Sequence, residues 1–249
     1  ADVKPRPMFA DLIRRVGSVD GIRRVRYTSP HPKDMTPDVF EAMEGTPTVV
    51  PHLHFPMQSG SDRILSAMHR GYTAERYLEK LAAARATITD LAVSTDIIVG
   101  FPGETEEDFA QTLEVAAEAE FDSAFTFVFS PREGTEAATM TDSFCDPEAV
   151  KDRYARLRTV IERSALAKHR ARVGGIEQVV VEGPSKKDPS VLTGRTVQNK
   201  LVHFAAEPLK PGTFAEVRIT EGHTQYLMGD LTEITERPRH RTRLEVTAV

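Results

Sequence analysis

The 249-residue sequence contains a single cysteine, Cys145, and this scarcity excludes several classes of site. One thiol cannot build an internal disulfide framework. It also cannot supply the ligands of an iron–sulfur or zinc site made only of cysteines. The sequence has no apolar run of transmembrane length and no signal-peptide pattern, so we expect a cytoplasmic protein that does not bind membranes.

A surplus of positive charge is also missing. The 32 basic residues face 37 acidic ones, which gives a formal net charge of −5, so the total charge does not indicate nucleic-acid binding. A hydrophobic content of 40% and a charged content of 28% are ordinary for a soluble protein. The length allows one large domain, or a domain with a small appendage.

The most informative stretch of the chain runs from Ala92 to Asp108. Residues 92–99 alternate between β-branched side chains and mostly small or acidic ones, which predicts a strand. The Gly100-Phe101-Pro102-Gly103 segment predicts a turn, and Thr105 with Asp108 predicts a capped helix start. Such a unit brings bare backbone to a ligand at the carboxyl end of the strand. The glycines alone fit an ordinary strand-to-helix corner better.

Strands and helices alternate on both sides of this stretch. Strands are predicted at 24–28, 49–55, 92–99 and 122–130, and helices at 9–17, 37–43, 63–68 and 74–87. Strands separated by helices predict parallel pairing with right-handed crossovers.

The alternation within the strands favours a barrel wall over an open sheet, because an open doubly wound sheet would make both faces apolar. We expect the shared face of Phe125, Phe127 and Phe129 to lie outside, under the helices. We expect His52 and His54 to face the interior, where packing and ligand binding are equally consistent roles. The predicted fold class is therefore α/β, with part of a (β/α) barrel whose site lies at the strand carboxyl ends.

The chain changes character after residue 146. A long helix over 147–172 carries eight basic residues, which form either a solvated surface or an electrostatic track for RNA. Five short strands at 177–182, 191–197, 201–204, 213–220 and 226–231 then predict a small closed β-barrel of the OB type. We accordingly divide the chain into residues 1–146, 147–172, 173–235 and a disordered tail over 236–249.

Several motifs, taken in order, resemble the radical S-adenosylmethionine methylthiotransferases. They are Pro56-Met57-Gln58-Ser59-Gly60-Ser61-Asp62, Thr95-Asp96-Ile97-Ile98-Val99-Gly100-Phe101-Pro102-Gly103-Glu104-Thr105, and Phe129-Ser130 with Arg132 and Gly134-Thr135. The β-rich region is similar to the family's TRAM domain, an RNA-binding barrel. The branch that thiomethylates an isopentenylated adenosine beside the tRNA anticodon is the most similar. The branch acting on threonylcarbamoyl-adenosine stays open, because it also shows the Arg132-Glu133-Gly134-Thr135 variant.

The resemblance implies where ligands bind. S-adenosylmethionine is expected at the strand carboxyl ends, against Gln58, Ser59, Ser94, Asp96, Gly100, Phe101, Pro102 and Ser130. The backbone of the glycine turn would meet the adenine, and Glu104 is expected to cap its own turn. RNA is expected on one face of the TRAM barrel, against Lys186, Lys187, Arg195, Lys200 and Arg218. No catalytic residue and no metal ligand is assigned within this chain.

The family also holds two [4Fe–4S] clusters on cysteine ligands, which this chain lacks, since Cys145 matches no family ligand. We therefore expect the C-terminal fragment of a longer enzyme, monomeric, inactive alone and directed at the tRNA anticodon loop. One alternative is a cluster-free RNA-binding protein. Another is a barrel enzyme for a phosphorylated metabolite, for which residues 132–135 are the one candidate phosphate loop.

Overall fold

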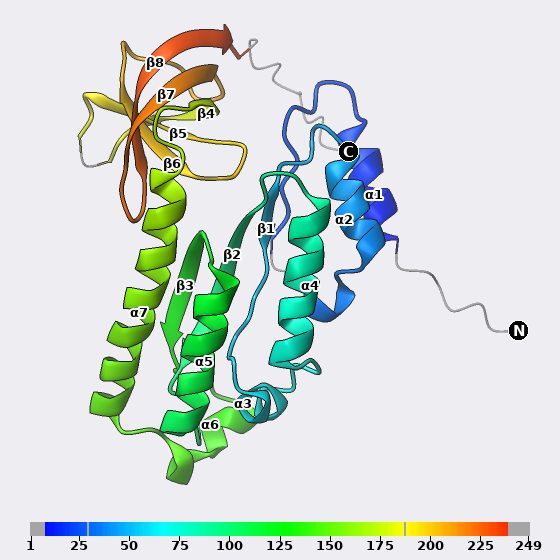
Figure 1. Cartoon of the computed structure of the whole chain (residues 1–249), viewed down its shortest axis with the longest axis vertical. Coiled ribbons are helices and arrows are strands. Elements are labelled where there is room, and N and C mark those ends of the chain that lie inside the picture. The colour runs from blue at the N-terminus through cyan, green and yellow to red at the C-terminus, as the bar shows by residue number, and fades with distance from the viewer. Residues whose placement is uncertain (1–7, 29, 187, 239–249) are drawn as a thin grey trace, which may run out of the picture. The chain divides into compact units, whose positions relative to one another are not determined.

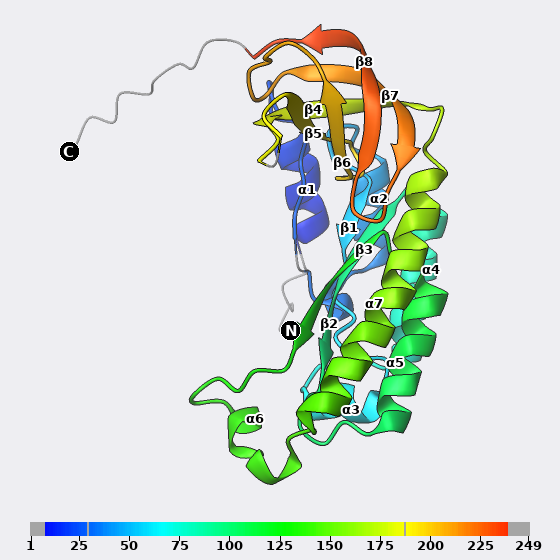
Figure 2. The same ribbon diagram turned by 90° about the vertical axis from the view of Figure 1, so that its left-hand side faces the viewer.

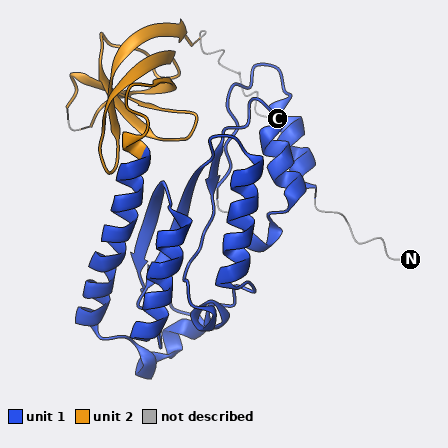
Figure 3. Ribbon diagram, viewed as in Figure 1, with its two compact units in different colours: residues 1–168 blue, residues 169–249 orange. Residues whose placement is uncertain are grey.

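The computed structural model describes residues 8–28, 30–186 and 188–238. It divides the chain into two compact units, residues 1–168 and 169–249 (Figure 3). The division falls inside helix α7 (Pro147–Arg170), whose last two residues belong to the second unit. The predicted tail over 236–249 lies largely outside the described residues. Among the helices described, none is long and apolar enough to cross a membrane.

The first unit alternates helices with three strands (Figure 1). Its elements are α1 (Phe9–Gly17), a 3-10 turn (Pro32–Asp34), α2 (Pro37–Glu44), β1 (His52–His54), α3 (Asp62–Ala67), α4 (Ala74–Thr87), β2 (Ala92–Val99), α5 (Glu106–Ala119), β3 (Ser123–Val128), α6 (Glu136–Thr139), a second 3-10 turn (Thr141–Ser143) and most of α7. The strand predicted over 24–28 is reduced to one bridge, between Val25 and Val49. Most of its residues are only partly buried, so few apolar contacts hold it in a sheet.

The three strands form a parallel sheet in the order β1-β2-β3. Helices α4, α5 and α7 lie on one side of β2 and β3 (Figure 2). The sheet residues that point to this side are fully buried, as Leu53, Val93 and Ile97 show. They pack with apolar side chains of the helices, such as Leu81 and Leu157, in one hydrophobic core. This arrangement leaves the strand carboxyl ends together at one edge of the sheet.

The phenylalanines of β3 do not lie under the helices, and that part of the sequence interpretation was wrong. The register places Phe125 beside Asp96 and Phe127 beside Ile98, on the sheet face away from the core. Phe125 is 58% exposed and Phe127 52%. Alternation fixes which residues share a face, but the packing of the helices decides which face is covered.

The second unit is a closed barrel of five strands in the order β4-β5-β6-β8-β7, which confirms the predicted small β-barrel. The strands are β4 (Ile176–Pro184), β5 (Val191–Arg195), β6 (Leu201–Ala205), β7 (Phe214–Gly222) and β8 (Leu227–Glu236). All pairs are antiparallel except β6 with β8. Inward side chains such as Val179, Val202, Phe204 and Val217 are fully buried and form a core of their own.

Candidate functional site

The turn after β2 is closed by hydrogen bonds from its own residues. Gly100 has a φ of 77° and donates its N–H to Glu104 Oε2 over 2.9 Å. The Glu104 N–H donates to the Phe101 carbonyl, also over 2.9 Å. Thr105 and Asp108 form the capping box that the sequence predicts at the start of α5. The expectation that Glu104 caps its own turn is therefore confirmed.

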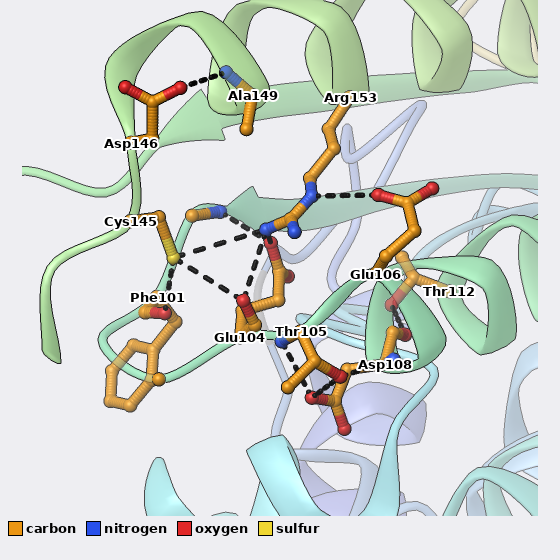
Figure 4. A network of polar contacts seen from close by, with 12 residues as sticks. Phe101, Glu104, Thr105, Glu106, Asp108, Thr112, Cys145, Asp146, Ala149 and Arg153 are labelled. Atoms are coloured by element: carbon orange, nitrogen blue, oxygen red, sulfur yellow. Dashed lines mark hydrogen bonds and ion pairs between the residues drawn. The ribbon is translucent and has the colours of Figure 1, made fainter.

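Arg153 of α7 joins the long helix to this turn (Figure 4). Its Nη1 donates to the Glu104 carbonyl oxygen and to Glu104 Oε2, each over 3.1 Å. Its Nε donates to Glu106 Oε2 over 3.2 Å. The Cys145 thiol donates to the carbonyls of Phe101 and Glu104 over 3.4 and 3.5 Å. The turn is thus held from outside by α7 and the segment before it.

The Glu104–Arg153 pair is buried, because its side chains are only 1% and 8% exposed. Burial raises the pKa of Glu104, and the hydrogen bonds from Gly100 and Arg153 oppose this shift only in part. Glu104 Oε1 is buried and accepts no hydrogen bond from the described residues. The carboxylate therefore depends on Arg153 for compensation of its charge.

Gly100 is required for a reason other than the predicted approach of a ligand. A Cβ at this position would lie 2.7 Å from Val150 Cγ2 of α7. Together with the positive φ, this contact accounts for the need for glycine at position 100, so no bound ligand has to be assumed. Gly103 has a similar φ of 80°, yet its nearest neighbour would be Arg63 Nη1 at 3.9 Å.

A second polar group joins α3 to α5. Asp108 accepts hydrogen bonds from the Ser61 hydroxyl over 2.6 Å and from the Arg63 guanidinium. Burial alone would raise the pKa of Asp108, but the hydrogen bonds from Arg63, Ser61 and Thr105 outweigh it and hold that pKa well below its usual range. A shallow cavity of about 420 Å³ lies beside this group. The group fixes the loop between β1 and α3.

Four polar residues meet on the sheet face away from the core, which we call the inner face. His54 Nδ1 lies 2.9 Å from Ser94 Oγ, and His54 Nε2 lies 3.1 Å from Asp96 Oδ2. Ser94 Oγ is also 3.2 Å from His52 Nε2. The Phe125 ring packs edge-on against His54 at 6.0 Å. The structure thus brings Ser94 and Asp96 together, as the alternation predicts, and adds a histidine link between them.

The Gln-Ser-Gly-Ser loop is divided between two surroundings. Gln58 has a φ of 67° and bonds its backbone to β2, from its N–H to the Asp96 carbonyl over 2.8 Å. Ser59 instead turns to α5, where its Oγ lies 3.2 Å from Thr112 Oγ1. Its exposure is 1%, and its oxygen also accepts the Ser61 N–H. The structure therefore places Gln58 beside the inner-face residues and Ser59 apart from them.

An apolar cavity of about 390 Å³ lies where β2 and β3 end, and sequence reasoning did not find it. Gly100, Phe129, Phe144, Val150 and Tyr154 are among its lining residues. The rings of Phe101, Phe129 and Phe144 follow one another in edge-on contacts of 5.5 and 5.8 Å. No local pattern could reveal it, because its walls come from segments about 50 residues apart. Pro102 and Ser130 belong to the two turns that follow the strands.

Basic residues predicted for RNA binding lie on different parts of the β-barrel unit. Lys186 is exposed in the loop after β4, and Lys187 lies outside the described residues. Arg195 and Arg218 lie opposite Val180 and Ile176 of β4, on the outer face of the barrel. Lys200, in contrast, is only 5% exposed.

Four basic side chains in the first half of α7 are paired with acidic ones. Besides the bonds of Arg153, Arg156 lies 2.7 Å from Glu106, and Arg158 lies 2.6 Å from Glu162. Lys151 lies 3.5 Å from Glu148. The contacts of Arg153 and Arg156 with Glu106 give this part of the helix a structural role.

An iron–sulfur cluster does not fit the residues of this chain. In the described part of the chain, no group of three or more His, Cys, Asp or Glu side chains is placed to hold a metal. Cys145 is the only cysteine of the sequence, and its thiol bonds to backbone carbonyls. Any cluster ligands would have to come from outside this chain.

Comparison with protein families identifies both parts of the chain. Residues 2–116 match the model of the radical SAM superfamily, and residues 170–232 match the TRAM domain. Residues 2–116 belong to the radical SAM superfamily. The four polar residues of the inner face and the Gly100–Glu104 turn lie within this matched segment, and the five-stranded barrel is the TRAM domain.

Several curated relatives carry the same name. The chain is 48% identical over 232 residues to the tRNA-2-methylthio-N(6)-dimethylallyladenosine synthase of Acidothermus cellulolyticus, covering 92% of this chain and 46% of that protein. It is 47% identical over 226 residues to the enzyme of Moorella thermoacetica, covering 90% and 50%. The chain thus spans about half the length of these relatives. Among solved structures, the radical SAM enzyme coproporphyrinogen III oxidase from Escherichia coli overlaps 75% of this chain and 44% of its own, with a TM-score of 0.48 and 15% identity.

Proposed function

We propose that this chain is the C-terminal part of a tRNA methylthiotransferase that converts N6-isopentenyladenosine beside the anticodon to its 2-methylthio derivative. The observation that carries the proposal is the 48% identity to a synthase of this name, which extends through the radical SAM segment and the TRAM domain in the same order. The part of that relative which this chain does not match could hold the cluster ligands. The proposed protein is a cytoplasmic monomer.

The inner face supplies the residues that would hold S-adenosylmethionine. The Asp96 side chain is 23% exposed, so its carboxylate is available to a polar ligand. His54 contacts both this carboxylate and the Ser94 hydroxyl and so holds the three side chains together. Gln58 and the backbone of Phe101 and Pro102 lie near the same strand ends, where barrels of this type bind ligands. When bound at a reduced cluster, this cofactor supplies a 5′-deoxyadenosyl radical. The part proposed for this chain is to bind the cofactor, orient it and exclude water.

The two polar groups around Glu104 and Asp108 would keep this surface in place. Arg153 and Glu104 hold the turn after β2 against α7, and Arg63 with Asp108 holds the loop after β1 against α5. Both turns carry residues proposed for the cofactor, so their rigidity supports binding without adding a contact of its own. The TRAM domain would bind the tRNA anticodon loop, as the family match suggests.

Expression of the whole open reading frame that encodes this chain tests the proposal. The purified protein would be reconstituted with iron and sulfide, reduced, and incubated with S-adenosylmethionine and tRNA carrying N6-isopentenyladenosine. Mass spectrometry of the nucleosides should show the 2-methylthio product. Activity only on tRNA carrying threonylcarbamoyl-adenosine would assign the other branch. tRNA binding without any modified product on either substrate would favour a non-catalytic RNA-binding protein.

A further inference from the structure

Three rings on the outside of the TRAM barrel form a cluster that the proposed cofactor site does not use. Tyr226 stacks on His223, with centroids 4.5 Å apart and planes 24° apart. Tyr226 also meets the edge of His203, at 5.2 Å and 68°. We call these three residues the ring group. All three side chains are partly exposed.

The turn that carries two of these rings is firmly built. It joins β7 to β8, and the His223 N–H donates to the Tyr226 carbonyl over 2.9 Å. A Cβ on Gly222 would lie 2.6 Å from the His169 carbonyl carbon, so the turn is packed directly against the end of α7. His169 Nδ1 also lies 2.5 Å from the His223 carbonyl oxygen. The rings are therefore held in place before any ligand arrives.

The ring group does not serve the core of the barrel. His203 lies on β6 between Val202 and Phe204, which are both fully buried and point inward. Its partners across the sheet are Thr193 and Met228, on the outer face. None of the three rings belongs to the hydrophobic core described for the barrel.

Polar groups border the rings. Thr193 Oγ1 lies 3.1 Å from His203 Nδ1, and Glu221 Oε2 lies 2.9 Å from His223 Nε2. Arg195 follows Thr193 by two residues on the same outer face of β5 and keeps 37% of its side chain exposed. Rings with hydrogen-bonding edges and a nearby guanidinium suit a planar, polar ligand better than an aliphatic one.

We propose that His203, His223 and Tyr226 form a stacking platform for unpaired bases of RNA. The proposal rests on the RNA-directed function proposed above and names the surface that would carry it. Proteins recognise single-stranded RNA by stacking splayed bases on aromatic side chains, and each base offers a face for this contact. A planar base extends the existing stack of His223 and Tyr226. Affinity at this surface comes mainly from stacking, since the Arg195 guanidinium on the neighbouring strand is already paired with Glu182.

A stacking surface and a phosphate surface respond differently to salt. Each lost phosphate contact reduces the slope of binding affinity against salt concentration, whereas a lost stacking contact lowers affinity at every salt concentration alike. Tyr226→Ala should therefore weaken binding without changing the slope. Lys186→Gln, in an exposed loop of the same unit, serves as the electrostatic control, because it can change only the charge contribution.

The experiment titrates the full 249-residue chain with a fluorescein-labelled 12-nucleotide oligo(A) RNA, followed by anisotropy at several salt concentrations. Tyr226→Ala should lower affinity roughly 5- to 160-fold, which is the range expected for one stacked base. Tyr226→Phe, which keeps the ring, should bind within about twofold of the wild type. Duplex RNA of the same length should bind with an affinity that the alanine substitution leaves unchanged.

The controls separate this proposal from the broader one. Circular dichroism establishes that each variant is folded, and His203→Ala replaces Tyr226→Ala should the latter unfold. Oligo(A) binding by the wild type with no loss in either alanine variant would overturn the stacking platform and leave RNA binding intact. Failure of the wild-type chain to bind oligo(A) and an anticodon stem-loop RNA would overturn both proposals.

Discussion

Replacement of Arg153 by methionine should destabilise the first unit in a way that depends on pH. The substitution keeps much of the side-chain volume but leaves the Glu104 carboxylate, 1% exposed, without its cation. Removing one partner of a buried ion pair costs about 3–5 kcal/mol of the free energy of unfolding. We expect a loss of this size at pH 8.

The pH dependence follows from the raised pKa of Glu104. A carboxyl whose pKa is higher in the folded state takes up its proton more readily there, so folding loses stability as pH rises above the unfolded-state value. Without Arg153 the pKa of Glu104 rises further. As pH rises, the variant therefore loses up to about 1.4 kcal/mol more unfolding free energy per pH unit, until the pH exceeds the pKa of Glu104 in the folded variant. At pH 5 the variant should therefore be much closer to the wild type.

Urea unfolding at pH 5 and pH 8 measures both effects. The sequence contains no tryptophan, and four of its five tyrosines lie in the first unit, so tyrosine fluorescence follows mainly that unit. The double variant with Glu104→Gln and Arg153→Met should recover most of the unfolding free energy that Arg153→Met alone loses, because no unpaired buried charge remains. Arg158→Met, which removes a solvent-exposed pair on the same helix, should cost far less unfolding free energy than Arg153→Met. An equal loss for Arg153→Met at both pH values would refute the reasoning.

Three further changes have defined outcomes. Gly100→Ala should cost more unfolding free energy than Gly103→Ala. Both substitutions add about 1–2 kcal/mol of backbone strain, but only the methyl group at position 100 would collide with Val150. Equal urea midpoints for the two variants would show that α7 moves to accommodate that methyl group. Asp108→Asn should lower stability by about 1.5–3 kcal/mol at pH 7. The stability difference between this variant and the wild type should shrink as pH falls below about 4, because the lowered pKa of Asp108 stabilises the fold only while the carboxyl is ionised. A difference that stays constant down to pH 2 would contradict this expectation. The isolated chain, reconstituted with iron and sulfide, should show no absorbance near 400 nm, and a stoichiometric brown species would contradict the missing-ligand argument.

Local patterns predicted much of this fold. The alternation of residues 92–99 and the capping pair of Thr105 and Asp108 describe β2 and the start of α5 as the structure has them. The apolar segments after Gly175 likewise predict the five strands of the TRAM barrel. These features depend on neighbouring residues, so a single sequence contains the information for them.

The candidate site was harder to predict from the sequence, because its contacts join residues that are far apart along the chain. Glu104 meets Arg153 across 49 positions, and Val150 explains Gly100 from a helix that sequence reasoning treated as separate. The inner-face position of Phe125 depends on which side α5 and α7 cover, and no periodicity contains that choice. The ring group is similar, since His203 and Tyr226 meet only when the barrel closes.

The exposed phenylalanines of β3 have a consequence for handling the isolated chain. In the described sheet, β3 pairs with β2 alone and is an edge strand. An edge with free backbone groups and exposed Phe125 and Phe127 is a template for unwanted pairing between molecules. Aggregation at high concentration is therefore the expected weakness of this chain in solution. A lysine at position 127 would protect this edge without removing any side chain from the core.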